Sequence, residues 1–140
     1  MADDTLNPAA VAAAGKSNAP VEAIPLCPST DLKDSSEAVP FDVTYAGQTL
    51  RAFAIRFEGQ AHAYLNRCAH VAMEMDFQPN QFFDSGGEWL ICATHGAMYH
   101  PATGECVGGP CRGGLVKIGL AEEAGVVHWH STWNLKPVEF

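Results

Sequence analysis

The sequence predicts an all-β domain built mainly from antiparallel strands. Residues 41–45 (Phe-Asp-Val-Thr-Tyr) alternate apolar and polar side chains with a period of two, which is typical of a strand with one buried face. Glycine-containing turns follow at short intervals, at Ala46-Gly47 and Gly59-Gln60. No stretch of about 10–15 residues with helical periodicity separates the apolar segments, so a parallel βαβ arrangement is not expected.

The strands can be placed in chain order by the same signals. After an opening strand that includes Cys27, we expect strands at 41–45, 48–57, 61–65, 89–92, 114–120 and 125–130. Cys27 is expected to be a buried core thiol. The folded domain is predicted to span 26–131.

The two ends differ from this domain in composition. Residues 1–25 are rich in Ala, interrupted by Pro and poor in large apolar side chains, so we expect a disordered extension. A short helix beginning at Asn7-Pro8 and ending at Gly15 is the alternative there. The tail over 132–140 includes Trp133, and either an edge-strand cover or an oligomer contact fits it.

Charge and hydropathy exclude several classes of function. Eight basic and sixteen acidic residues give a net charge of −8, which argues against binding to nucleic acid or anionic lipid. No apolar run reaches the roughly 18 residues that a membrane span needs. The start Met1-Ala-Asp-Asp has the wrong sign for a secretory signal. We therefore expect a soluble cytoplasmic protein with one domain, too small for a large multi-domain enzyme.

Two long connections interrupt the strands, and each begins at a Cys/His pair. The first connection covers 68–88 and opens with Cys68-Ala-His70. The second covers 94–114, and its pair is Cys92-Ala-Thr-His95. The second also contains six glycines, at 96, 104, 108, 109, 113 and 114. Long loops in a compact domain usually carry function. Two thiolates and two imidazoles on neighbouring loops could bind a metal together.

Zinc is the first metal to consider, since two Cys and two His form a common tetrahedral set. The spacing counts against it, because zinc modules usually pair Cys with Cys and His with His. The glycine-rich segment after His95 counts against it too, since closely approaching backbone N–H groups suit a sulfide-bearing cluster. A structural zinc module remains an alternative.

The pattern Cys68-x-His70 with Cys92-x-x-His95-Gly96 resembles the Rieske-type [2Fe-2S] proteins, and Thr103-Gly104 and Gly109-Pro110 extend the similarity. The flanking segments fit as well, and the resemblance covers roughly 25–130. It implies a Rieske-like antiparallel β-sandwich with a two-loop cluster-binding subdomain. It also implies one [2Fe-2S] cluster.

The resemblance assigns a role to each site residue. Cys68 and Cys92 would bind one iron, and His70 and His95 the other. Neutral imidazoles in place of two thiolates raise the reduction potential above that of plant-type ferredoxins. Ligand imidazoles beside ferric iron would be more acidic, so we expect electron uptake to be coupled to proton uptake at high pH. Gly109-Pro110 would form a third loop that keeps water from the cluster.

Hydrogen bonds to sulfur are expected to tune the potential further. Members of high potential carry a Ser two residues after the second His and a Tyr four residues after it. The corresponding residues here are Ala97 and Tyr99, so one donor is lost and one is kept. We expect a midpoint in the lower to middle part of the Rieske range.

The length of the chain narrows the kind of Rieske protein. On this length we do not expect the mononuclear iron domain of a Rieske oxygenase. Subunits of quinol-oxidising complexes carry an additional disulfide between the loops, and Met73 and Thr94 occupy those positions here. We expect an electron-transfer protein rather than a stand-alone catalyst, a small ferredoxin between a flavin-dependent reductase and a terminal oxygenase. The small subunit of a multi-component reductase of the nitrite-reductase type is the alternative, and oligomeric state stays open.

Several residues lie outside this pattern. Cys106 and Cys111 flank Gly108-Gly109-Pro110 and could form a small disulfide, but in a reducing compartment we expect free thiols. Phe77, Phe82 and Phe83, in a segment that lengthens the gap between the motifs, fit either packing or an apolar docking rim. Four further histidines are expected on the surface without a metal: His62, His100, His128 and His130.

Overall fold

The structure is a computed structural model, and it describes residues 22–68, 73–76, 78–93, 96–111 and 113–138. Within these residues the regular structure is one short 3₁₀ turn, η2 (Ser29–Asp31), and strands that form three antiparallel sheets. The all-β prediction is confirmed. The strands are β1 (Ala23–Pro28), β2 (Val39–Tyr45), β3 (Gln48–Phe57), β4 (Gln60–Leu65), β5 (Leu90–Ile91), β6 (Met98–Tyr99), β7 (Cys106–Gly108), β8 (Lys117–Ile118), β9 (Leu120–Glu123), β10 (Val126–His130) and β11 (Leu135–Pro137).

The central sheet has the order β11-β2-β3-β4-β8. Its two hairpins turn at Ala46-Gly47 and Glu58-Gly59, where all four residues have positive φ. Such turns match the right-handed twist of the strands that they join, and Gly takes the second position without steric cost. The second turn therefore lies one residue earlier than the sequence suggested, and β4 begins at Gln60.

The second sheet, β1-β10-β9, faces one side of the central sheet. Its inward side chains include Cys27, Val127 and Trp129, which are buried against Val43 and Ala54. Alternate residues of β3 serve the two faces of the central sheet, as the pleat of a strand requires. This pair of sheets is the predicted sandwich, and Cys27 is a buried core thiol as expected.

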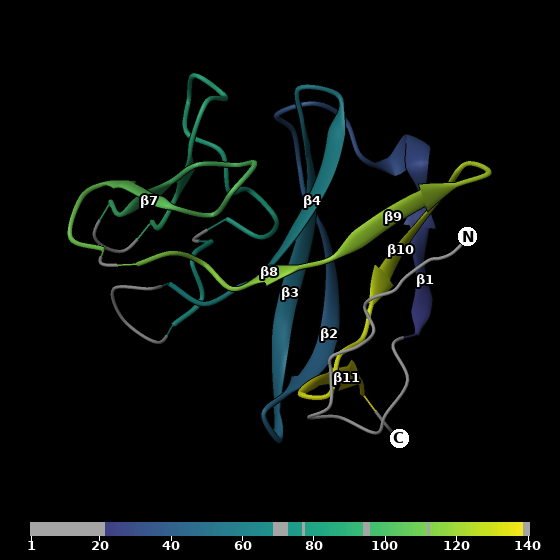
Figure 1. The fold of residues 1–140 in the computed structure, drawn as a ribbon. Helices are drawn as coiled ribbons and strands as arrows, with labels where there is room; N and C mark the ends of the chain where they lie inside the picture. Colours follow the sequence, from purple (N-terminus) through teal and green to yellow (C-terminus); the bar gives the residue numbers. More distant parts are fainter. Residues whose placement is uncertain (1–21, 69–72, 77, 94–95, 112, 139–140) are drawn as a thin grey trace.

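The third sheet, β5-β6-β7, belongs to a separate region that packs against the other face of β3 and β4. Figure 1 shows the region around β7 and the strands β1, β9 and β10 on opposite sides of the central strands. Phe82 is fully buried there, with its ring stacked on Phe53 at a centroid distance of 3.8 Å. Phe83 packs near Phe57 at 6.2 Å. Both therefore serve packing rather than a docking rim, and Phe77 lies outside the described residues.

The C-terminal half contains elements that the sequence did not predict. The expected strand 114–120 is two short strands, because the chain leaves the central sheet after β8 and joins the second sheet as β9. The short strands β6 and β7 were not predicted. In the tail, β11 pairs with β2, so the tail covers the edge of the central sheet, while Trp133 remains 58% exposed.

At the other end, β1 begins at Ala23, inside the range predicted as an extension, and residues 1–21 lie outside the described ones. Among the described residues, no helix is long and apolar enough to cross a membrane.

Candidate metal centre

The first cysteine loop begins directly after β4. Cys68 is 3% exposed, and its backbone N–H donates a hydrogen bond to the carbonyl of Met73, at 2.9 Å. This bond closes the two ends of the loop on each other. The loop thereby presents a buried thiol at its base, while Met73 is exposed at 45%.

The second cysteine loop follows β5. Cys92 is fully buried, its N–H donates to the carbonyl of Ala97 at 2.8 Å, and its carbonyl accepts from the N–H of Gly96 at 2.9 Å. Gly96 has φ +77°, a conformation that glycine adopts without the penalty of a side chain. The second loop is therefore a tight turn with a buried thiol at its start.

The two loops are hydrogen-bonded to each other. The N–H of Ala93, next to Cys92, donates to the carbonyl of Met75 in the first loop at 2.9 Å. Asn66 holds Met75 and its neighbour in place. Its side-chain oxygen accepts a hydrogen bond from the N–H of Met75, and its side-chain N–H donates to the carboxylate of Asp76, both at 2.8 Å. The predicted meeting of the two cysteine loops is thus seen in the backbone.

The two predicted histidine ligands, His70 and His95, lie outside the described residues. Within the described part of the chain, no group of three or more His, Cys, Asp or Glu could hold a metal ion. Of the four predicted ligands, Cys68 and Cys92 are among the described residues.

Tyr99 reaches the first loop from β6. Its side chain is fully buried, and its hydroxyl oxygen lies 3.4 Å from the sulfur of Cys68. A thiolate sulfur can only accept a hydrogen bond, so with a deprotonated Cys68 the tyrosine hydroxyl is the donor. Ala97 is also fully buried and offers no side-chain donor. Tyr99 therefore lies within hydrogen-bond distance of the Cys68 sulfur, as its predicted role requires.

The third loop lies against the second one. A Cβ at Gly109 would be 2.7 Å from the carbonyl oxygen of Gly96 and 2.9 Å from the Cα of Ala97, closer than real Cβ contacts. Gly109 also has φ +80°. Only glycine permits this approach, and Pro110 next to it is exposed. The third loop therefore lies directly against the second cysteine loop.

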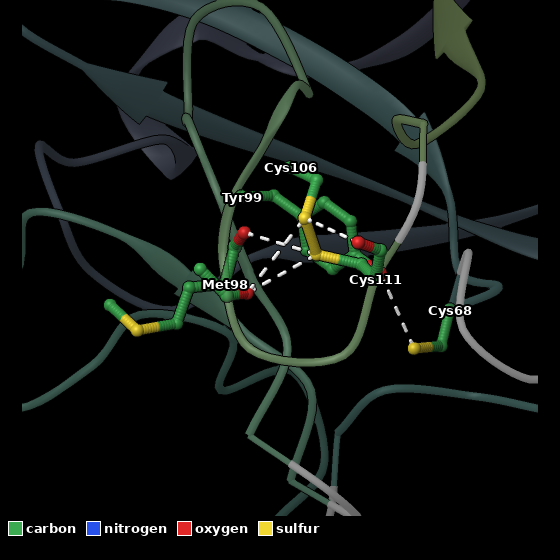
Figure 2. Close-up of a disulfide and its surroundings, with 6 residues drawn as sticks. Cys68, Met98, Tyr99, Cys106 and Cys111 are labelled. Atoms are coloured by element: carbon green, nitrogen blue, oxygen red, sulfur yellow. Dashed lines mark hydrogen bonds between the residues drawn. A yellow bond between two sulfur atoms is a disulfide. The ribbon is translucent and has the colours of Figure 1, made fainter.

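Cys106 and Cys111 form a disulfide, so the prediction of free thiols is wrong. That prediction rested on the reducing compartment, whereas the turn at Gly108-Gly109-Pro110 brings the two Cα atoms to 5.9 Å, within the range of disulfides. Figure 2 shows the disulfide beside Met98 and Tyr99, with the contact from the tyrosine to Cys68 as a dashed line. Cys111 is buried in the same apolar cluster as Cys68 and Cys92.

A second polar group, which the sequence did not reveal, lies at the edge of this region. The ammonium group of Lys117 donates to the carbonyl of Ala102 at 2.6 Å and the hydroxyl of Tyr64 at 3.2 Å, and it lies 3.1 Å from Nδ1 of His62. Burial and the charge of Lys117 lower the pKa of His62. Burial also raises the pKa of Tyr64 well above its usual range.

The other described histidines differ in their surroundings. His100 also has partners, since its Nδ1 accepts from the N–H of Ala102 at 3.0 Å and its ring meets Trp89 edge-on at 5.9 Å. His62 and His100 are half-buried, and each has a polar partner that the sequence did not reveal. His128 and His130 are half-buried on β10.

Comparison with known proteins agrees with this geometry. The model of the Rieske [2Fe-2S] domain matches residues 22–119. The chain belongs to the Rieske [2Fe-2S] domain family. No curated protein sequence matches the chain.

Solved structures show the same fold at low identity. The ferredoxin of carbazole 1,9a-dioxygenase from Nocardioides aromaticivorans IC177 is 17% identical with a TM-score of 0.58, over 76% of this chain and 95% of that one. The Sphingomonas yanoikuyae B1 ferredoxin is 21% identical with a TM-score of 0.60, over 79% and 100% of the two chains. The cyanobacterial plasma membrane Rieske protein from Synechocystis PCC 6803 is 17% identical with a TM-score of 0.55, over 76% and 97%.

Family membership identifies the cofactor as a [2Fe-2S] cluster of the Rieske type. The donor set in the structure fits such a cluster, because two buried thiols stand at the starts of two loops that are hydrogen-bonded to each other. A [2Fe-2S] cluster exchanges electrons, and its potential depends on charge and on hydrogen bonds to sulfur. The chain is therefore an electron carrier, and the structural zinc alternative loses its support.

Proposed function

We propose that Cys68 and Cys92 bind one iron of the cluster and that His70 and His95 bind the other. The observation that carries the proposal is the hydrogen bond from Ala93 to Met75, which ties the two cysteine loops together at 2.9 Å. The family's ligand pattern falls on these four positions, two in each loop. When it is bound, the cluster supplies reversible one-electron chemistry.

The chain's own residues set how easily that electron is accepted. The Tyr99 hydroxyl donates toward the sulfur of Cys68 and stabilises negative charge there, which raises the potential. Ala97 supplies no second donor. Gly96, Gly109 and Pro110 bring the third loop against the second and keep water from that side. One donor in place of two supports a midpoint in the lower to middle part of the Rieske range.

We further propose that the protein carries electrons from a flavin-dependent reductase to a terminal oxygenase in the cytoplasm. Two similar structures are ferredoxins by name, one of them from a carbazole dioxygenase, and they are covered over 95% and 100% of their lengths. A net charge of −8 suits brief, steered encounters with basic patches on redox partners. In this role the chain is a component of an oxidoreductase system and not a catalyst by itself.

An anaerobic redox titration followed by electron paramagnetic resonance tests the ligand assignment. The wild type should give a reversible one-electron Rieske signal, and Cys68→Ser should abolish or strongly alter it. Cys27→Ser is the matched control, since Cys27 is also a buried cysteine but belongs to the other apolar cluster, and it should retain the signal. Bound zinc without acid-labile sulfide in the wild type would refute the proposal.

The same titration also tests the role. A low midpoint fits delivery to an oxygenase, whereas a high midpoint would point to a quinol-linked chain.

Reduction by a flavin-dependent reductase, and transfer to a Rieske oxygenase, should slow as ionic strength rises, because salt screens exposed charges. Purification as a fixed subunit of a larger reductase would instead support the nitrite-reductase-type alternative.

A further inference from the structure

The Cys106–Cys111 disulfide is not used by the ligand assignment, yet it lies in the core of the cysteine-loop region. Cys106 belongs to β7 and pairs directly with Tyr99 of β6. Cys111 ends the turn that contains Gly109, which touches the second loop at Gly96. The disulfide therefore joins β7, which pairs with Tyr99 of β6, to the loop that lies against Gly96.

The sulfur atoms have little free space. The Cys106 sulfur lies 3.0 Å from the carbonyl oxygen of Cys111, and the Cys111 sulfur lies 3.2 Å from that of Gly108 and 3.7 Å from that of Met98. A disulfide sulfur carries no proton, so these are packing contacts. Two separate thiol sulfurs need about 3.5 Å or more between them, against about 2 Å when bonded. The two chain segments must move apart when the bond is broken.

We propose that this disulfide is a positioning element that holds the Tyr99 hydroxyl against the sulfur of Cys68 and so sets the cluster's potential. The inference rests on the proposed ligand role of Cys68. The Tyr99 hydroxyl lies 3.4 Å from the Cys68 sulfur, and a hydrogen bond weakens as its two atoms separate, so a displacement of β6 and β7 weakens the contact. Figure 2 shows the disulfide, Tyr99 and Cys68 together.

Reduction of the disulfide should reverse this positioning of Tyr99. A dithiol reductant supplies two electrons and two protons: the protein S–S bond breaks, both protein sulfurs become thiols, and the reductant closes its own disulfide. Of the two residues, Cys106 is half-buried and Cys111 is buried. Reduction should release the Gly109 loop and lower the midpoint of the cluster.

A double-mutant cycle tests the proposal. The midpoint is titrated anaerobically for the wild type, Cys106→Ala/Cys111→Ala, Tyr99→Phe and the combination of all three. The double-cysteine variant should have a lower midpoint than the wild type. In the Tyr99→Phe background, the same two cysteine substitutions should cause no further fall. If the disulfide only stabilised the fold, the shift of the midpoint that its loss causes would not depend on Tyr99.

Several results would overturn the inference. These are an unchanged midpoint in the double-cysteine variant, an equal fall in both backgrounds, or alkylation of both cysteines in the wild type without reductant. If the double-cysteine variant does not fold, wild-type protein that is reduced with a dithiol and alkylated must show the lower midpoint instead. Cys27→Ser is the control and should keep the wild-type value. Absence of any cluster signal in the wild type would refute the ligand proposal itself, whereas a normal signal without a shift refutes this inference alone.

Discussion

Replacement of Tyr99 by phenylalanine removes one oxygen atom from the cysteine-loop region and keeps the ring. The ring is fully buried, so its packing should be retained and the hydroxyl is not replaced by water. The lost group is the hydroxyl that lies 3.4 Å from the sulfur of Cys68. Because the reduced cluster carries more negative charge, this donor stabilises the reduced form more than the oxidised one, and Tyr99→Phe should lower the midpoint.

The size of the shift follows from the value of one hydrogen bond. A net contribution of about 1 kcal/mol corresponds to about 40 mV for a one-electron couple. An anaerobic titration followed by the resonance signal of the reduced cluster measures it directly. A fall smaller than about 10 mV would refute the tuning argument, since such a bond would then contribute almost nothing.

Tyr64→Phe is the matched control for this prediction. Tyr64 is also fully buried in the same apolar cluster, but its hydroxyl donates to the carbonyl of Pro101 at 2.6 Å and not to a cysteine. This substitution should lower the free energy of unfolding by about 1–2 kcal/mol, because a buried carbonyl and Lys117 lose a partner. The midpoint should stay at the wild-type value.

Three further predictions concern stability. Gly109→Ala should shorten the lifetime of the bound cluster, because the new Cβ meets Gly96; the loss of the cluster's absorbance over time measures this lifetime. Gly47→Ala is the control, since Gly47 has φ +83° and nothing within 4 Å of the new Cβ. It should cost only about 1 kcal/mol of unfolding free energy in denaturant. Phe82→Ala should cost about 3–5 kcal/mol in the same assay, since its ring is buried and stacked on Phe53. The hydrogen bond from Arg56 lowers the pKa of Glu122 below its usual 4.5, so Glu122→Gln should cost about 1 kcal/mol of unfolding free energy at neutral pH. As the pH falls through the lowered pKa, the difference in unfolding free energy between wild type and variant should vanish. A difference that stays constant with pH would contradict the ion pair.

Much of the sandwich could be predicted because its signals are local. Period-two alternation over 41–45 and glycine at the second position of each turn specify hairpins without knowledge of the partner sheet. The crossing of the chain from the central sheet at β8 to the second sheet at β9 could not be predicted in this way. A single glycine, Gly119, lies between the two strands, and the sequence there does not distinguish a change of sheet from a continuing strand.

The site was predictable where spacing carries the information. Cys68 and Cys92 each end a strand segment, and the structure brings their loops together. The Cys106–Cys111 disulfide was the less favoured alternative because a reducing compartment favours free thiols, whereas the turn between the two cysteines decides the distance between them. The Lys117 group was missed because His62, Tyr64 and Ala102 meet it only after the sheet and the loop have packed.

The central claim is that two thiolates and two imidazoles hold the cluster. Its most direct test is nitrogen hyperfine spectroscopy on the reduced protein with ¹⁵N introduced at histidine alone. Two histidine nitrogens bound to iron are expected, and His70→Ala or His95→Ala should remove the Rieske signal, whereas His128→Ala should leave it intact. A reduced cluster without coupled histidine nitrogens, or a preparation that holds zinc and no acid-labile sulfide, would contradict the account.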